Sequence, residues 1–512
     1  MITIDTSLFS LNSFRNVVID NQKICLSEKA ISKIQKSNDF LNEFVKGKVV
    51  YGVNTGLGPM AQYKIEEKDQ KLLQKNLIRS HAAGIGAHVA AHMVKGAMLC
   101  RLIGFTKGYS GVSLATAEIL LAFINNNIIP VVPKHGGVGA SGDLVQLSQI
   151  AICLIGEGEV YYKGKKLLTK VVLEELNIPP LEIQLREGLA LINGTSFMTS
   201  VGIINLLKAN QALENSILNG CLINELMESF DDHFSLELNK VKLHKHQQLI
   251  ASKMRNILKG SKLIQERSAT YYSGTNEEKI FTKKVQEYYS IRCLPQILGP
   301  ISKTIEDAEE VLLAEMNSVA DNPIIDIEAQ NIFHGGNFHG DFVSSEMSKL
   351  KNSIIKLTVL MERQLNFLLN HNLNGVFNPF LNAGVLGLNL GLQGAQYAAT
   401  STTAESQSLS ASIYVHSIPS NNDNQDVVSM GANEALQTYK VLDNFFDVNS
   451  VLCLAVHQAC LLKNEQDKLS LQTQNYLEGF ATIIPFIKED NEIRPILEKI
   501  KENLLSFEET NY

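Results

Sequence analysis

Gly136-Gly137-Val138-Gly139-Ala140-Ser141-Gly142-Asp143 is a glycine-rich segment that follows the apolar run 128–133 in a chain of 512 residues. It contains four glycines, one hydroxyl and one carboxylate. Glycine adopts backbone conformations that other residues avoid and lets two stretches of backbone approach closely. Such freedom beside a lone serine and an acid indicates either a tightly folded loop or a reactive site.

Three interpretations of this segment are open. In the first, the loop precedes a helix, and Asp143 is the N-cap before an apolar series that begins at Leu144. In the second, Ser141 is a nucleophile, but a nucleophile elbow needs a glycine two residues later, where this chain has Asp143. In the third, the segment cyclises on itself.

Cyclisation needs small residues on both sides of the serine. The nitrogen of Gly142 attacks the carbonyl carbon of Ala140, and Ser141 loses its hydroxyl as water. The product is 4-methylidene-imidazol-5-one, an electrophilic ring made from the chain, for which no soluble cofactor is needed.

The segment 138–144 resembles the cofactor-forming motif of the aromatic amino acid ammonia-lyases, the enzymes that act on histidine, phenylalanine or tyrosine. Further matches follow the order of that family's motifs, and the resemblance extends from about residue 10 to the end of the chain. The additional matching segments are 51–58, 80–84, 193–195, 286–292, 335–338 and 424–426.

This resemblance implies a catalytic set and an assembly. The ring is expected from Ala140, Ser141 and Gly142, with Tyr51 as the base and Tyr289 beside the ring. A tyrosine that acts as a base near neutral pH needs hydrogen bonds or positive potential to stabilise its phenolate. By the same resemblance we expect a homotetramer whose active sites are each built from three subunits.

The resemblance also implies a substrate-binding set. Arg292 is expected to hold the substrate carboxylate, because its planar guanidinium matches a carboxylate in two hydrogen bonds. Asn193 is expected to bond the ring or that carboxylate, and Phe338 to pack near the ring. The full set is His81, Asn193, Gln286, Arg292, Phe338, Asn424 and Gln425.

Several residues of these motifs also have an ordinary structural explanation. A loop tyrosine such as Tyr51 is usually a packing residue, and a histidine at a helix end such as His81 often interacts with the helix dipole. Thr195 is a plausible N-cap. Gln286, Tyr289 and Arg292 are spaced by three, as expected on one polar face of a helix.

The residues at two places in the chain favour different substrates. Ser80-His81 resembles the histidine enzymes, which however have glutamate where this chain has Gln425. A neutral amide suits a phenol better than a partly cationic imidazole, and His81 can bond the phenol hydroxyl. We therefore expect elimination of ammonia from L-tyrosine to give trans-p-coumarate, with histidine to urocanate as the alternative and an aminomutase after that. A non-catalytic helical scaffold is the remaining alternative class.

Bulk properties exclude several classes of protein. With 46 basic and 53 acidic residues the net charge is −7, so we expect neither nucleic acid nor a membrane surface as a partner. The seven cysteines are scattered, as is typical of reduced thiols in the cytoplasm. Residues 1–6 contain no targeting signal, and no apolar run long enough to cross a membrane is free of charge. His334 and His339 lack a third ligand nearby, so we expect no metal.

The apolar spacing predicts a mainly α fold, a long up-down helical bundle with a smaller mixed N-terminal region that carries the cofactor loop. We expect residues 1–195 to form the N-terminal domain and 196–512 the bundle. One β-hairpin is expected, with strands 159–162 and 165–168. Strands and helices do not alternate, which excludes a doubly wound sheet. Helices are expected at 69–79, 90–107, 112–126, 144–155, 196–230, 302–317, 343–370 and 433–462.

Overall fold

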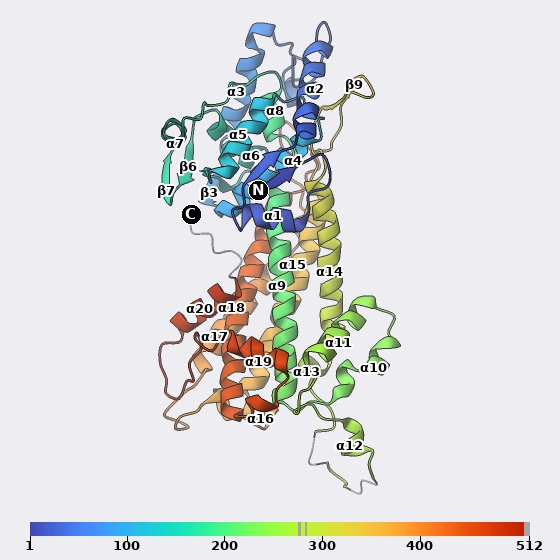
Figure 1. Ribbon diagram of the computed structural model, residues 1–512, viewed down its shortest axis with the longest axis vertical. Helices are drawn as coiled ribbons and strands as arrows, with labels where there is room; N and C mark the ends of the chain where they lie inside the picture. The colour runs from blue at the N-terminus through green and yellow to red at the C-terminus, as the bar shows by residue number, and fades with distance from the viewer. Residues whose placement is uncertain (275–277, 282–283, 506–512) are drawn as a thin grey trace.

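Helices dominate the computed structural model, which describes residues 1–274, 278–281 and 284–505 (Figure 1). A mixed region formed by the N-terminal part of the chain lies at one end, and long helices extend from it toward the other end. The prediction of a mainly α fold built on a long helical bundle is confirmed.

The bundle is organised around long helices that run nearly its whole length. Helices α9 and α18 are buried on almost every side because other helices surround them, whereas α14 and α15 each have one polar face. Helix α18 packs against α15 and α9. The long helices are α9 (Ser196–Leu226), α14 (Leu294–Met316), α15 (Asp341–Leu369) and α18 (Gly431–Lys463).

The N-terminal region consists of shorter helices packed around α4, which is buried along its length and also contacts α9. Serine side chains cap two of them, since Ser10 accepts from the backbone of Ser13 and Ser27 from that of Ala30. These helices are α1 (Leu11–Val18), α2 (Glu28–Phe44), α3 (Gln70–His81), α4 (Ala91–Thr106), α5 (Leu114–Asn125), α6 (Leu144–Leu154), α7 (Thr169–Leu176) and α8 (Glu187–Ile192).

Short strands form small sheets at the edges of this region. The predicted hairpin is confirmed as β6 and β7, and both residues of its turn, Lys163 and Gly164, have positive φ, as a two-residue hairpin turn requires. In the part of the chain that the structure describes, three sheets have two strands and one has three. The two-stranded sheets are β1 (Ile2–Ile4) with β2 (Ile24–Leu26), β3 (Ile85–His88) with β5 (Pro133–His135), and β8 (Ile324–Asp326) with β9 (Asn331–Phe333). The three-stranded sheet has the order β4 (Ile129–Pro130), β6 (Glu159–Tyr162), β7 (Lys165–Leu168).

Smaller helices cover the far end of the bundle and its sides (Figure 1). Helix α11 packs on α14, while α17 and α20 pack on α18. These helices are α10 (Leu236–Lys240), α11 (Lys245–Ile257), α12 (Arg267–Tyr271), α13 (Tyr289–Arg292), α16 (His371–Asn374), α17 (Gln393–Ser408), α19 (Leu471–Glu478) and α20 (Arg494–Leu504).

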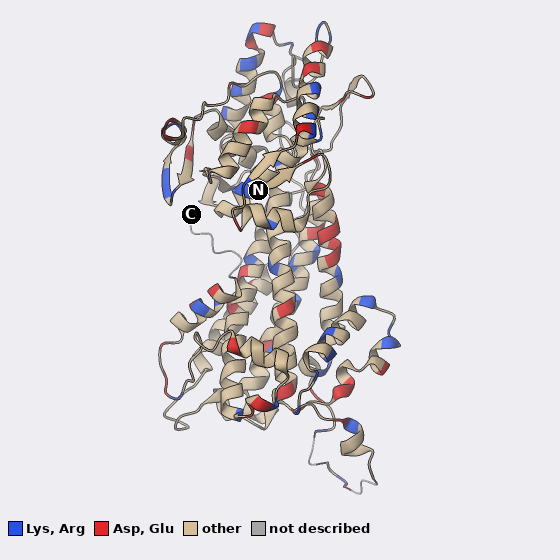
Figure 2. Cartoon of the chain, viewed as in Figure 1, with Lys and Arg blue, Asp and Glu red and all other residues tan. Residues whose placement is uncertain are grey.

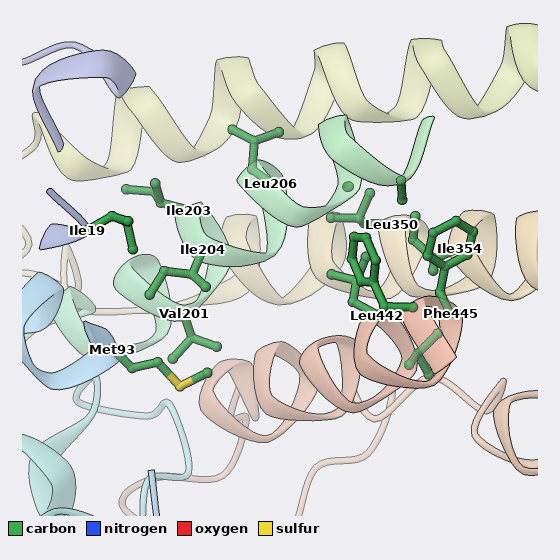
Figure 3. Close-up of a cluster of buried hydrophobic side chains, with 14 of the residues drawn as sticks. Ile19, Met93, Val201, Ile203, Ile204, Leu206, Leu350, Ile354, Leu442 and Phe445 are labelled. Carbon is green, nitrogen blue, oxygen red and sulfur yellow. The ribbon is translucent and has the colours of Figure 1, made fainter. Parts of the chain in front are cut away.

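The hydrophobic core is continuous between the N-terminal region and the bundle. Figure 3 shows Met93 of α4 beside Val201 of α9, in the same cluster as Leu350 of α15 and Phe445 of α18. One buried cluster therefore includes residues from both sides of the expected boundary at 195/196. The division into two domains stays a prediction.

Helix α14 begins earlier than the sequence pattern predicts, at Leu294 rather than residue 302. Pro295 lies in the first turn, where a proline leaves no intrahelical donor missing. Pro300 is accommodated farther inside the helix. The first of these prolines favours a helix start, which agrees with the observed beginning of α14.

Charges of both signs occur together along the whole molecule (Figure 2). One helix, α18, is long and apolar enough to cross a membrane, with a mean hydropathy of 1.5 over its most apolar window. However, 83% of that window is buried inside the protein, as expected for the central helix of a bundle.

Candidate active site

A cavity of about 470 Å³ opens beside the glycine-rich segment 136–143. Its walls come from the loop 51–65, from α3 and from the loop 421–425, in addition to that segment. Seven of the residues proposed for the site line it: Tyr51, His81, Ser141, Asn193, Phe338, Asn424 and Gln425.

Close backbone contacts hold the segment in place. Gly142 has a φ of +76° and pairs with Gly194 as an isolated bridge, and the amide of Asp143 donates to the carbonyl of Gly194 at 2.8 Å. A Cβ on Gly142 would lie 2.0 Å from the carbonyl oxygen of Gly194. Only glycine therefore fits at this position.

The carbonyl oxygen of Ser141 accepts two hydrogen bonds. The Nδ2 atom of Asn193 donates to it at 3.0 Å and the backbone amide of Gly194 at 3.3 Å. On the other side of the residue, the Nε2 atom of Gln425 donates to the hydroxyl of Ser141 at 3.1 Å. Donors thus face both oxygen atoms of Ser141.

A segment from the distant C-terminal half covers the loop. The amide of Met430 donates to the carbonyl of Val138 at 3.0 Å, and the Ser429 hydroxyl donates to that of Gly139 at 2.9 Å. Ala140 is nearly fully buried in a small cluster with Met430. The residues that precede α18 therefore hold the glycine-rich loop in position.

Asp143 does not cap the helix that follows it. It occupies the N-cap position of α6 without a side-chain bond to that helix, and its Oδ2 atom accepts from the backbone amide of Met198, in the first turn of α9, at 2.9 Å. Burial, the largest effect, raises the pKa of the Asp143 carboxyl to about 7. Thr195 is not a side-chain cap of α9 either, because its hydroxyl donates to Glu315.

Tyr51 and His81 both line the cavity. The phenol oxygen of Tyr51 accepts a hydrogen bond from the amide of Gly58 at 3.1 Å, and its ring lies edge-on to His334. The Nδ1 atom of His81, the last residue of α3, lies 2.9 Å from the carbonyl oxygen of Leu77. The Ser80 hydroxyl also lies 3.0 Å from this nitrogen. A proton on Nδ1 would be donated to the Leu77 carbonyl and would leave Nε2 as an acceptor.

The sequence pattern of the aromatic amino acid lyases matches residues 9–482. The chain belongs to the aromatic amino acid lyase family. The prediction from the sequence motifs that the protein is a carbon–nitrogen lyase is thereby confirmed.

Known members of the family resemble this lyase over almost its full length. A tyrosine 2,3-aminomutase from Chondromyces crocatus is 38% identical over 459 residues, which covers 88% of this chain and 86% of the relative. A histidine ammonia-lyase from Macrococcus caseolyticus is 35% identical and covers 97% of both chains. The solved structure of a tyrosine aminomutase from Streptomyces globisporus has a TM-score of 0.94 at 33% identity, covering 99% of this chain and 97% of that one.

The residues of this lyase fit the ring that the family motif implies. All three residues are small, Ala140 and Gly142 are buried, and the half-buried Ser141 lines the cavity. The backbone of Gly194 occupies the space that a side chain at 142 would need. The donors on Ser141 face its carbonyl oxygen, which would stay on the ring, and its hydroxyl oxygen, which would leave as water. Among the residues the structure describes, no group of three His, Cys, Asp or Glu side chains could hold a metal.

Gln286, Tyr289 and Arg292 lie elsewhere in the lyase. They do not line the cavity, and α13 lies toward the opposite end of the bundle (Figure 1). The prediction that the three share one helical face is wrong, because α13 spans only Tyr289–Arg292 and Gln286 precedes it. Tyr289 is 69% exposed, and the guanidinium of Arg292 lies over its ring at 4.8 Å.

Several cavity residues escaped the sequence analysis. Leu73, Asn76 and Leu77 line the wall formed by α3, one to two turns before His81. With Ser80 and His81 they follow the pattern i, i+3, i+4, i+7 and i+8 from Leu73, which places all five on one helix face and is the signal that could have found them. Met60 and Asn421 come from loops, where no periodicity indicates which side chains face a cavity.

Proposed function

We propose that this lyase eliminates ammonia from L-tyrosine to give trans-p-coumarate. The composition of the cavity is the observation on which this proposal rests. No aspartate or glutamate is among the described residues that line it, and apolar side chains such as Leu57, Leu77 and Leu189 form much of the wall. An aromatic ring without charge suits such a cavity better than an imidazole that is partly cationic.

His81 supports the choice of a phenol. With the proton on Nδ1, the Nε2 atom of His81 can accept a hydrogen bond from the substrate hydroxyl. Phenylalanine lacks that hydroxyl and would leave the polar group unpaired, which costs free energy in a closed site. The neutral amide of Gln425, unlike a carboxylate, adds no preference for a cation.

Tyr51 is proposed to remove the β-proton of the substrate. The amide of Gly58 donates to the phenol oxygen of Tyr51 at 3.1 Å and fixes its position in the cavity wall. The ring made from Ala140, Ser141 and Gly142 would supply an electrophile that activates the amino group for departure. Asn193 and Gln425 orient the groups around residue 141. Phe338 also lines the cavity and would exclude water from it.

A second copy of the chain is proposed to complete the site. The cavity needs a cation for the substrate carboxylate, and Arg292 lies far from it within one chain. Exposed apolar residues such as Val385, Leu388 and Leu390 favour assembly, because a subunit interface would cover them. We propose a homotetramer in which Gln286, Tyr289 and Arg292 of one copy reach the cavity of another.

The substrate can be assigned by a direct assay. The purified enzyme is incubated separately with tyrosine, phenylalanine and histidine, and the unsaturated product is followed by its ultraviolet absorbance. We expect coumarate to form fastest. Urocanate formation far above coumarate formation would instead assign histidine, the substrate named for the 35% identical relative.

An aminomutase is the second candidate, because the 38% identical relative is named as one. Such an enzyme uses the same residues but returns ammonia to the β-carbon. Chromatographic analysis of the tyrosine reaction distinguishes the two activities, since a mutase yields β-tyrosine in excess over coumarate.

We propose the cytoplasm as the place of action. All seven cysteines lie in the described part of the chain, and each is a free thiol. Five of them are buried in the helical core, where free cysteines pack as small apolar side chains. Reduced thiols are the usual state in that compartment.

A further inference from the structure

The loop 420–425 has a conformation that sets the orientation of Gln425. Three successive residues that are not glycine, Asn421, Asn422 and Asp423, have φ values of 56°, 53° and 58°. Asparagine and aspartate tolerate this left-handed region better than most residues. The turn brings Ser420 opposite Gln425, and their backbones exchange two hydrogen bonds of 3.1 and 3.3 Å.

This pairing places the two side chains in contact. The hydroxyl of Ser420 donates to the Oε1 atom of Gln425 at 3.2 Å, while the Nε2 atom of Gln425 donates to the hydroxyl of Ser141 at 3.1 Å. Because Oε1 is occupied by Ser420, the amino group of the amide is directed at Ser141. The side chains of Ser420, Gln425 and Ser141 form a series of hydrogen bonds. It ends on the hydroxyl oxygen of Ser141, which must leave as water when the ring forms.

We propose that Gln425 assists the departure of the Ser141 hydroxyl during ring formation and that Ser420 is its positioning residue. The inference rests on the proposed function, since it concerns how that ring is made. Sequence motifs place Gln425 only beside the substrate, whereas these contacts give it an earlier role in maturation. The inference uses only residues of the same chain.

The two losses of water differ in the bonds they break. In the first, Gly142 N bonds to Ala140 C, and the Ala140 oxygen leaves with the hydrogens of Gly142 N and Ser141 N. In the second, the Cα–H bond of Ser141 breaks, its electron pair forms the Cα–Cβ double bond, and Oγ leaves with the electrons of the Cβ–Oγ bond. The released proton joins this hydroxide as the second water.

Hydrogen-bond donors face both oxygen atoms of Ser141 that take part in the second loss of water. Asn193 and Gly194 bond the Ser141 carbonyl, which makes the neighbouring Cα–H bond more acidic. Gln425 donates to Oγ and so stabilises the negative charge that grows there as the bond to Cβ breaks. Loss of Gln425 should therefore slow the second loss of water and leave the first one intact.

The test follows maturation by mass rather than by activity. The full-length chain is synthesised in a cell-free system, and its intact mass is recorded over time for the wild type and for Gln425→Met, Ser420→Ala and Ser420→Thr. Methionine keeps the size of glutamine without its donor, and threonine keeps the hydroxyl of serine. Asn422→Gly is the control, because it relieves the left-handed backbone in the same loop without touching either hydrogen bond.

We expect the wild type, Ser420→Thr and Asn422→Gly to lose two waters at similar rates. Gln425→Met should accumulate a chain that is one water lighter and complete the second loss at least about tenfold more slowly, with Ser420→Ala slowed to a smaller degree. Wild-type rates in Gln425→Met would overturn the inference. Retention of both waters in that variant would also overturn it, because it would indicate a purely structural role.

A wild type that itself loses no water would contradict the proposed function instead. The two failures are therefore distinguishable. The inference fails only when the wild type matures and the variants do not differ from it in the way described.

Discussion

The side-chain amide of Gln425 lies 3.1 Å from the hydroxyl oxygen of Ser141, although the two residues are 284 positions apart in the chain. The contact joins the loop before α18 to the glycine-rich loop before α6. It exists because Ser429 and Met430 bond the backbone of the glycine-rich loop directly. The candidate site is thus assembled from two segments that are far apart in the chain and meet at Ser141.

Tyr51→Phe should abolish catalysis and leave the protein folded. Phenylalanine keeps the ring contact with His334 but has no oxygen to accept the proton. We expect product formation to fall by about 10²- to 10⁴-fold, the usual contribution of a general base, with two waters still lost from the chain. Activity within a few-fold of the wild type would show that another residue is the base.

Gly142→Ala should disrupt the loop itself. The added Cβ would lie 2.0 Å from the Gly194 oxygen, and the φ of +76° is unfavourable for alanine. We expect a loss of about 1–3 kcal/mol in the free energy of unfolding, measured in urea, together with a chain that does not lose its waters. Gly394→Ala is the control, because Gly394 has open space around it and lies in helix α17. That variant should be as stable as the wild type or slightly more so.

Glu434→Gln tests the anchor of the loop before α18. The fully buried Glu434 lies 2.7 Å from the Nζ atom of Lys351 and accepts from the amides of Ile413 and Tyr414. Removing its charge leaves the buried Lys351 without its anionic partner, although Lys351 still donates to Ala411 and Gln437. We therefore expect a loss of about 3–5 kcal/mol in the free energy of unfolding. In Glu174→Gln, which breaks an exposed pair with Lys170, the loss should be below about 1 kcal/mol. Equal effects in both variants would contradict the anchoring role of Glu434.

The stability of the protein should fall with rising pH because of Asp143. Its folded pKa of about 7 exceeds the value near 3.9 expected in the unfolded chain. Between these values the folded state keeps a proton that the unfolded state has lost, so the free energy of unfolding decreases as pH rises and levels off above the folded pKa. Asp143→Asn should lack this contribution while retaining an acceptor for the Met198 amide. Urea unfolding of the wild type and of Asp143→Asn at several pH values between these two pKa values checks the prediction. A difference in the free energy of unfolding between the two proteins that does not change with pH would contradict it.

The long helices could be predicted because their apolar residues recur at spacings of three and four over many turns. Helices α9, α15 and α18 lie close to their expected bounds for this reason. The start of α14 could not be found in the same way, since Pro295 and Pro300 interrupt the pattern without ending the helix.

Sequence motifs indicated only some of the residues that line the candidate site. Motifs indicated Ser141, Asn193 and Gln425, but nothing local to the sequence shows that the amide of Gln425 faces the serine hydroxyl. The hydrogen-bond partner of the Asp143 carboxyl could not be predicted either, because the packing of α9 brings the backbone amide of Met198 to it. Such contacts depend on tertiary structure, which residue spacing does not encode.

The intact mass of the purified protein, followed by peptide mapping, tests the central claim most directly. We predict a chain lighter than its sequence by two water molecules, with the loss confined to the peptide that contains Ala140, Ser141 and Gly142. A chain of unaltered mass with an intact serine at 141 that still releases ammonia from an amino acid would contradict the account.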